Sequence, residues 1–379
     1  MDNLGTIGGR APREHDGIYR FIVRTLHIDI PLLIALIVLS IIGLITLYSA
    51  SNHSMDVVNR QIVFMLIGFG AMFVFAQIPP HTLRFWAPWL FGIGIIMLVA
   101  VFFFGSVGKG AQRWLDLGFV RFQPSESLKI GLPMMLAWFL AEAQLPPSPK
   151  HLLISAFLIA LPVGLIVIQP DLGTSLLIGS TGVIVLLLAG ISWMLVGIFI
   201  FIGAASAPLL WYLLHDYQRQ RILTFLNPEN DPLGAGYHII QSKIAIGSGG
   251  LYGKGWLNGS QSHLEFLPER STDFIFAVFS EEFGFIGILV LMAMYMFIVI
   301  RGLFIASQAQ DTFSRLLSGS LILTFFVYIF VNTGMVMGLL PVVGLPLPML
   351  SLGGTSLVTL MAGFGIIMSV HTHRKLYST

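Results

Sequence analysis

The sequence contains no cysteine and few charged residues, and both shortages limit what the protein can be. Among 379 residues, Cys is absent and charged residues make up 10%. The absence of thiols excludes disulfide bonds, thiolate metal sites and a cysteine nucleophile. With 20 Lys and Arg against 18 Asp and Glu, the net charge of +2 is too small to indicate binding to nucleic acid. Any chemistry must therefore use carboxylates, Lys, Arg, His or hydroxyl groups.

Apolar residues make up 56% of the chain, which indicates an integral membrane protein. Apolar stretches bounded by charges or by Pro and Gly predict about ten transmembrane helices and an all-α fold. The expected spans are residues 30–49, 61–78, 83–104, 125–141, 151–168, 172–189, 193–214, 274–300, 316–339 and 347–370. The break at residues 169–171 is either a tight turn between two spans or a kink in one long helix. Residues 1–379 form a single membrane domain with no room for a soluble catalytic domain.

The distribution of Lys and Arg in short connections predicts the orientation. With both termini in the cytoplasm, ten basic residues fall inside and four outside. The inside residues are Arg10, Arg13, Arg20, Arg24, Arg84, Lys150, Arg301, Arg315, Arg374 and Lys375, and the outside ones are Arg60, Lys109, Arg113 and Arg121. An outside connection that keeps Lys109, Arg113 and Arg121 against this bias is a candidate anion site.

Three segments lie outside the predicted spans: cytoplasmic tails at residues 1–29 and 371–379, and a large extracytoplasmic loop at residues 215–273. Residues 247–255 of that loop superficially resemble a nucleotide-binding loop. The pattern fails because Ser248 replaces its first Gly and Gly255 replaces its Ser or Thr. A flexible Gly-rich turn is the better interpretation. The histidines form no metal-binding motif, so no metal site is expected from them.

Ionisable residues at the edge of the membrane are costly and therefore candidates for function. Glu126 and Lys129 lie three residues apart and share a helix face, so they either neutralise each other or hold a polar cavity in which Lys129 or Arg121 meets an anionic substrate. Asp171 either caps the following helix, by accepting from Gly173 or Thr174, or faces the substrate.

Two further places in the long loop are candidate sites. Arg219 and Arg221 suit either a phosphate or lipid headgroups. Asp273 lies where the loop re-enters the membrane, on a predicted helix that follows Pro268 and aligns Asp273, Ala277, Ser280 and Gly284 on one face. A partly shielded carboxylate there fits a general base, although a solvated Asp at a membrane boundary is an ordinary feature.

Six ordered motifs, in a likeness that extends from Leu26 to the C-terminus, resemble the SEDS (shape, elongation, division and sporulation) family of bacterial cell-wall polymerases. The motifs are residues 109–114, 121–129, 169–175, 231–238, 268–277 and 338–354. The Pro-Leu-Pro at residues 346–348 resembles the elongation members, the RodA type, more than the division members, the FtsW type. Two positions depart from the family pattern, because Ser271 stands where members often carry His and Leu352 where they often carry Tyr.

The resemblance implies a ten-span peptidoglycan glycosyltransferase that polymerises lipid II on the outer face of the bacterial cytoplasmic membrane. Asp273 matches the family's catalytic carboxylate and is expected to act as the general base. The outside cations that could stabilise the departing pyrophosphate are Lys109, Arg113, Arg121, Lys129, Arg219 and Arg221, with Lys129 and Arg113 the first choices. The resemblance also implies a class B penicillin-binding transpeptidase and other elongation proteins as partners. No cofactor is identified, and assistance by a divalent cation is left open.

Two other functions compete with this interpretation. A flippase for lipid-linked precursors would use the same polar cavity for transport, but it predicts polar residues in both halves of the membrane. The candidate ionisable residues instead cluster on the outer side of the membrane. A non-catalytic scaffold for the transpeptidase would leave Asp273 dispensable.

Overall fold

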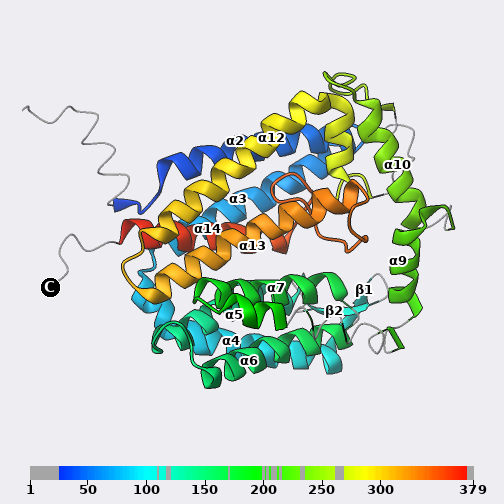
Figure 1. Ribbon diagram of the computed structural model, residues 1–379. Helices are drawn as coiled ribbons and strands as arrows, with labels where there is room; N and C mark the ends of the chain where they lie inside the picture. Colours follow the sequence, from blue (N-terminus) through cyan, green and yellow to red (C-terminus); the bar gives the residue numbers. More distant parts are fainter. Residues whose placement is uncertain are drawn as a thin grey trace, which may run out of the picture.

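The computed structural model describes residues 25–108, 111–116, 121–169, 171–198, 201, 205, 211–212, 216–230, 235–260 and 269–373. Within these residues the fold is a bundle of long helices (Figure 1). The helices are α2 (Ile30–Ala50), α3 (Met55–Gln77), α4 (Pro80–Phe104), α5 (Pro124–Ala141), α6 (Pro149–Ile168), α7 (Leu172–Leu188), α9 (Asp216–Leu226), α10 (Ala235–Ser248), α12 (Ile275–Ser307), α13 (Thr312–Val336) and α14 (Thr355–Thr372). Three short strands and a 3-10 turn complete it: β1 (Ser106–Gly108), β2 (Ala111–Asp116), β3 (Arg121–Phe122) and η1 (Pro228–Asn230).

Most of the predicted spans appear as helices with boundaries shifted by a few residues. Seven described helices are long and apolar enough to cross a membrane: α2, α3, α4, α6, α12, α13 and α14. Helix α7 is apolar but shorter, and α5 covers the span expected at residues 125–141. The span expected at residues 193–214 lies largely outside the described residues. These helices indicate a multi-pass membrane protein.

Local sequence explains where several helices begin. Proline stands in the first turn of α2, α4, α5 and α6, where its missing N–H costs no helical hydrogen bond. Aspartate caps three helices: the side chains of Asp29, Asp171 and Asp311 accept from the backbone N–H groups of Leu32, Thr174 and Ser314.

The chain reverses direction between α6, which ends at Ile168, and α7, which begins at Leu172. A Cβ built on Gly179 would meet Val163, and one built on Gly182 would meet Ile159. The later residue of α7 thus contacts the earlier residue of α6, so the two helices run antiparallel. The break at residues 169–171 therefore separates two helices and is no kink in one.

Long-range contacts define the directions of the other helices. Arg301 bonds to Asp29 at one end of the pair α2 and α12, and Ser49 bonds to Glu282 at the other, so these helices are antiparallel. Helix α14 runs parallel to α3, because Gly353 bonds to Gln61 near their first turns and Ser369 bonds to Ile78 at their far ends. The chain thus enters α2 and leaves α14 at the same end of the bundle, as the charge distribution predicts.

A cluster of polar side chains closes that end. Asp29 accepts from Arg301 Nε at 3.1 Å and Nη2 at 2.6 Å, and its Oδ2 lies 3.0 Å from His371 Nδ1. Burial alone would raise the pKa of Asp29, but hydrogen bonds with His371 and Arg301 outweigh burial and hold this pKa well below its ordinary value. Alongside, His27 stacks on His373 with ring centroids 3.8 Å apart. Burial and the nearby His373 lower the pKa of His27.

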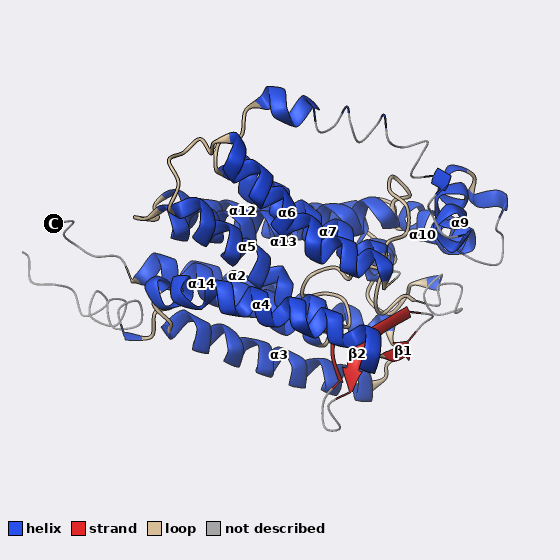
Figure 2. Cartoon of the chain, turned by 90° about the horizontal axis from the view of Figure 1, so that it is seen from below, coloured by secondary structure: helices blue, strands red, loops and turns tan. Residues whose placement is uncertain are grey.

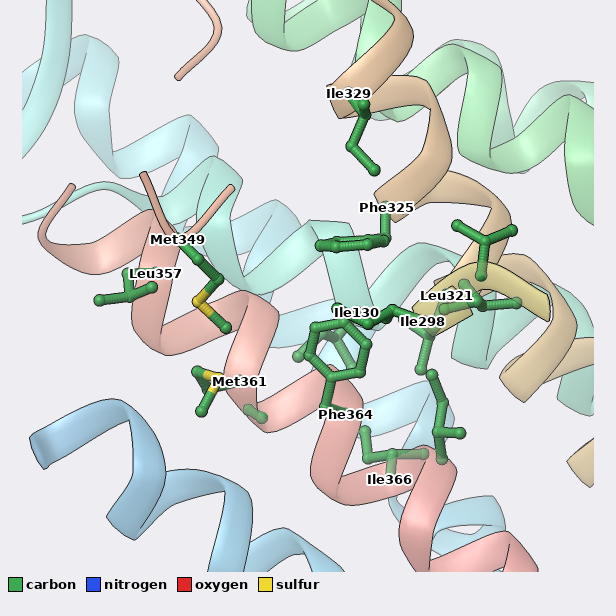
Figure 3. Close-up of a cluster of buried hydrophobic side chains, with 14 of the residues drawn as sticks. Ile130, Ile298, Leu321, Phe325, Ile329, Met349, Leu357, Met361, Phe364 and Ile366 are labelled. Atoms are coloured by element: carbon green, nitrogen blue, oxygen red, sulfur yellow. The ribbon is translucent and has the colours of Figure 1, made fainter. Parts of the chain in front are cut away.

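The main apolar core extends through most of the bundle, and one part of it lies between α5, α12, α13 and α14. Figure 3 shows Phe325 and Ile329 of α13, Phe364 and Ile366 of α14, and Ile298 of α12 gathered in one cluster. Phe325 and Phe364 meet edge to face at 5.0 Å between ring centroids. This packing fixes α13 against α14, and so fixes the connection between them at the opposite end.

That opposite end carries the extramembrane elements. The small antiparallel sheet β1–β2–β3 connects α4 to α5, and α9 and α10 belong to the long connection before α12. Both views place the sheet and these two helices at the end of the bundle away from the C-terminus (Figures 1 and 2). The loop predicted at residues 215–273 is therefore partly helical, and it lies at the same end as the connection with Arg113.

Candidate active site

Asp273 lies in a turn immediately before α12. The prediction that it belongs to the helix is wrong, because α12 begins at Ile275 and Phe274 is its N-cap. The turn forms where the N–H groups of Thr272 and Phe274 both donate to the carbonyl of Glu269, and the Thr272 hydroxyl donates to the Glu269 carboxylate at 2.8 Å. Contrary to the prediction from the sequence, Asp273 therefore does not share a helix face with Ala277 and Ser280.

The connection between α13 and α14 holds this turn in place. Asn332 of α13 donates to the carbonyl of Asp273 at 2.9 Å and to that of Leu345 at 2.7 Å. The backbone N–H of Leu352 donates to Ser271 at 2.8 Å, and the hydroxyl of Ser351 donates to the carbonyl of Thr272. The backbone around Asp273 is thus fixed on two sides.

The Asp273 carboxylate is directed at Gly344. A Cβ built on Gly344 would lie 3.5 Å from Asp273 Oδ2. Gly344 has φ +75°, a conformation that favours glycine, so the turn leaves open backbone beside the carboxylate. Asp273 is neither fully buried nor fully exposed, a setting in which it can meet both a substrate and a proton acceptor from solvent.

Asp171 both caps α7 and forms an ion pair. It accepts from the N–H of Thr174 at 3.3 Å and from its hydroxyl at 3.0 Å, as the capping interpretation predicts. Its Oδ2 also lies 3.4 Å from Arg113 Nη1 and 3.5 Å from Gln123 Nε2. The capping interpretation is confirmed, the carboxylate also pairs with Arg113, and the substrate-facing role stays a prediction.

Glu126 and Lys129 form the predicted pair in the first turns of α5. Lys129 Nζ lies 2.7 Å from Glu126 Oε1, and both residues are buried. Lys129 Nζ also lies 5.3 Å from the centre of the Tyr328 ring. The pair is thus a neutralised unit inside the bundle, between α5 and α13.

Two neighbouring residues of the α13–α14 connection, Val343 and Gly344, lie near the segment of Asp171 and near Asp273, respectively. A side chain on Gly173, two residues after Asp171, would overlap the carbonyl oxygen of Val343. The next residue, Gly344, faces Asp273. The turn that carries Asp171 and the turn that carries Asp273 therefore lie on either side of one short backbone segment.

Among the other predicted cations, Arg219 is the one whose side chain the structure describes. Arg219 of α9 donates from Nε to the carbonyl of Trp211 and from Nη2 to that of Tyr212, both at 2.9 Å, which is a local structural role. The side chains of Arg121 and Arg221 lie outside the described part, although Arg121 pairs with Asp116 in the sheet. Lys109 lies outside the described residues. Within the described residues, no three His, Asp or Glu side chains gather as metal ligands.

Three residues of the site were missed in the sequence: Gln123, Tyr328 and Asn332. Asn332 and Tyr328 are polar groups inside an apolar span, which is a usable signal because such groups are costly in lipid. Gln123 gave no signal beyond its place next to Pro124. The partners of all three come from distant segments, so their roles depend on the tertiary structure.

Comparisons with known proteins identify the family. The family model of cell cycle proteins that covers FtsW, RodA and SpoVE matches residues 29–376. The chain is 56% identical to the peptidoglycan glycosyltransferase MrdB of Escherichia coli (strain K12) over 353 residues, with 93% of this chain and 95% of that protein covered. It is 31% identical to the peptidoglycan glycosyltransferase RodA of Treponema pallidum (strain Nichols), with 91% of this chain and 98% of that protein covered.

Solved structures agree with this result. One chain from work on structural coordination of polymerization and crosslinking by a peptidoglycan synthase complex matches with a TM-score of 0.81 and 29% identity, over 92% of this chain and 99% of that chain. The rod shape determining protein RodA of Thermus thermophilus matches with a TM-score of 0.70 and 27% identity, over 92% of this chain and 98% of that chain. With the sequence motifs and the helical bundle, these matches show that the chain belongs to the FtsW/RodA/SpoVE family, the SEDS family.

Proposed function

We propose that this protein is an elongation-type peptidoglycan glycosyltransferase that polymerises lipid II on the outer face of the cytoplasmic membrane. The observation that carries the proposal is the Asp273 carboxylate, held by the α13–α14 connection and directed at open backbone at Gly344. Family membership and the name peptidoglycan glycosyltransferase, borne by the relatives from Escherichia coli and Treponema pallidum, support it.

Asp273 acts as the general base. The 4-hydroxyl of the acceptor sugar loses its proton to the Asp273 carboxylate as its oxygen bonds to the anomeric carbon of the donor. The bond from that carbon to the lipid pyrophosphate breaks, and the pyrophosphate leaves with the bonding electrons. Attack opposite the leaving group converts an α-linked donor to a β-linked product. Because pyrophosphate is a stable anion, no protein acid has to protonate it.

Arg113 is the better placed of the two first-choice cations. Its side chain is 28% exposed, and a guanidinium has several N–H donors, so it can stay paired with Asp171 and still meet the pyrophosphate as negative charge grows. The Lys129 side chain is only 8% exposed and its amine is bonded to Glu126. Lys129 serves mainly to keep the cavity wall polar and neutral, and direct contact with substrate requires it to leave Glu126.

A small, mostly apolar pocket lies beside Lys129, between α5, α13 and α14. Its polar members are Lys129, Thr324, Tyr328 and Thr359. At about 30 Å³ it has room for about two water molecules, so the prenyl chain of the substrate has to lie elsewhere or these helices have to separate.

A class B penicillin-binding transpeptidase is the proposed partner. The support is the structural match to a chain from a peptidoglycan synthase complex whose polymerization and crosslinking are coordinated. A partner that crosslinks new strands has to act on the same side of the membrane as Asp273.

The test is polymerisation of labelled lipid II by the purified protein with its transpeptidase partner, combined with a lipid II translocation assay in proteoliposomes. Glycan strands without translocation are the expected result. Translocation without glycan would favour the flippase, and a folded complex that does neither would favour the scaffold. Addition of a chelator to the same reaction shows whether a divalent cation assists the departure of pyrophosphate.

A further inference from the structure

Helix α12 is broken at Gly284, close to its outer end. Gly284 has φ +64° and ψ −165°, which is not helical. The break separates an outer piece, residues 275–283, from an inner piece, residues 285–307. At 1.5 Å per residue the inner piece is about 34 Å long, enough to cross the hydrocarbon core by itself. The outer piece is therefore not needed to span the membrane, and it carries Asp273 just before its first residue.

The Gly-rich loop, residues 249–255, is inserted into this break. The N–H groups of Lys254 and Gly255 donate to the carbonyls of Glu281 and Glu282, each at 3.0 Å. In return, the N–H groups of Phe285 and Ile286 donate to the carbonyls of Gly250 and Leu251, at 2.9 and 3.1 Å. An unbroken helix would join Phe285 to Glu281 and Ile286 to Glu282 directly. The loop thus supplies four hydrogen bonds in place of these two helical ones.

Three glycines permit this close approach. A Cβ on Gly249 would overlap the carbonyl of Ser280, one on Gly253 would overlap that of Glu282, and one on Gly284 would overlap the N–H of Gly253. The segment that resembled a nucleotide loop in the sequence therefore owes its glycines to packing against α12. It is a fixed insert, and the expectation of a flexible turn is wrong.

An ion pair between the exposed Lys254 and the buried Glu281 fastens the insert to the outer piece. Lys254 Nζ lies 2.7 Å from Glu281 Oε1, and the Glu281 side chain is fully buried. Ser260 donates to the same carboxylate oxygen at 3.1 Å, and Ser248 lies 3.5 Å from it. The adjacent Glu282 accepts from Ser49 at the outer end of α2. Lys254 and Glu281 are joined through both backbone and side chain, so they link the loop to the outer piece in two ways.

We propose that Lys254 and Glu281 are positioning residues that, together with the α13–α14 connection, set the direction of the outer piece of α12 and thereby the place of Asp273. The inner piece alone does not set it, because two helical hydrogen bonds that would join the pieces are replaced by bonds to the loop. The inference rests on the proposed function, since it assigns the pair to the reaction in which Asp273 takes part. Neither residue is assigned any contact with substrate.

The kinetic test compares Lys254→Met, Glu281→Gln and the double variant in lipid II polymerisation. If the single substitutions displace the Asp273 carboxylate by a fraction of an ångström, kcat should fall about 10- to 100-fold. KM should stay within about threefold of wild type, because substrate contacts are unchanged. The loss of kcat in the double variant should be no larger than that in the less active single variant, since each substitution breaks the same ion pair. A kcat within about twofold of wild type in both single variants, or additive losses, would overturn the proposal.

Conservative and matched variants separate positioning from general damage. Lys254→Arg keeps the charge, so it should retain most of the wild-type kcat, and a loss as large as that of Lys254→Met would contradict the assignment. Lys150→Met and Glu229→Gln make the same side-chain changes at exposed positions. Both should leave kcat and KM at wild-type values.

Hydrogen exchange gives a readout that does not depend on activity. In detergent, Lys254→Met and Glu281→Gln should speed amide exchange in residues 274–284 while exchange in α14 stays as in wild type. Unchanged exchange in residues 274–284 would show that the pair does not hold the outer piece. If the wild-type protein makes no glycan, the proposed function fails, and the exchange result still decides whether the pair fastens the outer piece.

Discussion

The guanidinium of Arg113 lies 3.4 Å from the carboxylate of Asp171, although one residue belongs to the small sheet before α5 and the other begins α7. The contact ties the extramembrane sheet to the turn between α6 and α7. It also explains how an outside loop keeps a basic residue against the charge bias, since a carboxylate holds that residue in place. Asp171 thus has two separable tasks: it caps a helix and it orients a cation.

These tasks can be separated with two substitutions at Asp171. Asn is as good an N-cap as Asp, so Asp171→Asn should melt close to wild type, whereas Asp171→Ala should lose about 1 kcal/mol of stability. Both should lower kcat/KM for lipid II about tenfold or more, because Arg113 loses its charged partner. Melting temperature in detergent and polymerisation rate are the measurements.

Asp311 provides the control for that prediction. It caps α13 through a 2.9 Å bond from Ser314, at the opposite end of the bundle from Asp171. Asp311→Ala should lower the melting temperature and leave the rate per folded molecule unchanged. If Asp171→Asn polymerises like wild type, Asp171 is only a cap.

The Glu126–Lys129 pair should show the behaviour of a buried salt bridge. Glu126→Gln or Lys129→Met leaves one uncompensated buried charge and should cost about 3–5 kcal/mol. The double variant Glu126→Gln/Lys129→Met removes both charges and should recover most of that loss. The measurement is the thermal stability of the three purified variants. Single variants as stable as wild type would show that water reaches the pair.

Stability should fall on acidification because of the cluster at the cytoplasmic end. The pKa of His27 is lowered by burial and by His373. The pKa of Asp29 is also lowered, since hydrogen bonds with His371 and Arg301 outweigh its burial. A lowered pKa means that the unfolded chain binds the proton more tightly, so stability decreases below about pH 6.5 for His27 and further below about pH 4 for Asp29.

His27→Gln should therefore flatten the dependence of the melting temperature on pH between about pH 5 and 7. Asp29→Asn should lower stability at neutral pH, where the carboxylate is bonded to Arg301. His81→Gln, a change at an exposed position at the start of α4, is the matched control and should leave the dependence as it is. A His27→Gln profile with the slope of wild type would contradict the account.

Gly173 should tolerate no side chain. Its hypothetical Cβ would overlap the carbonyl of Val343, so Gly173→Ala must displace either the start of α7 or the α13–α14 connection. Both movements disturb the site, and polymerisation should fall more than stability does. Gly164→Ala in α6, where nothing lies within 4 Å, is the control and should retain wild-type activity. Equal activity of the two variants would show that the connection can shift without consequence.

Much of the fold was predictable because it depends on local composition. Long apolar runs predict the spans, and aspartates before them predict caps such as Asp171. The Glu126–Lys129 pair follows from a spacing of three on a helix. In each case both partners lie within one helical turn, so the sequence alone contains the whole interaction.

The remaining features depend on partners that are distant in the chain. Nothing near Arg113 indicates Asp171, and nothing near Lys129 indicates Tyr328. The start of α12 was misplaced because the turn at Glu269–Phe274 competes with the helix, and the preference for the turn comes from Asn332 and Ser351. Gly284 gave no warning of a break, since a glycine in an apolar run is as often a site of helix packing.

The central claim is that the Asp273 carboxylate performs proton transfer in glycan polymerisation. The most direct measurement compares wild type, Asp273→Asn and Asp273→Glu in lipid II polymerisation with the transpeptidase partner, at matched melting temperature and complex formation. We predict no detectable glycan with Asp273→Asn, which has the same shape but no base, and partial activity with Asp273→Glu. Polymerisation by Asp273→Asn at the wild-type rate would contradict the account.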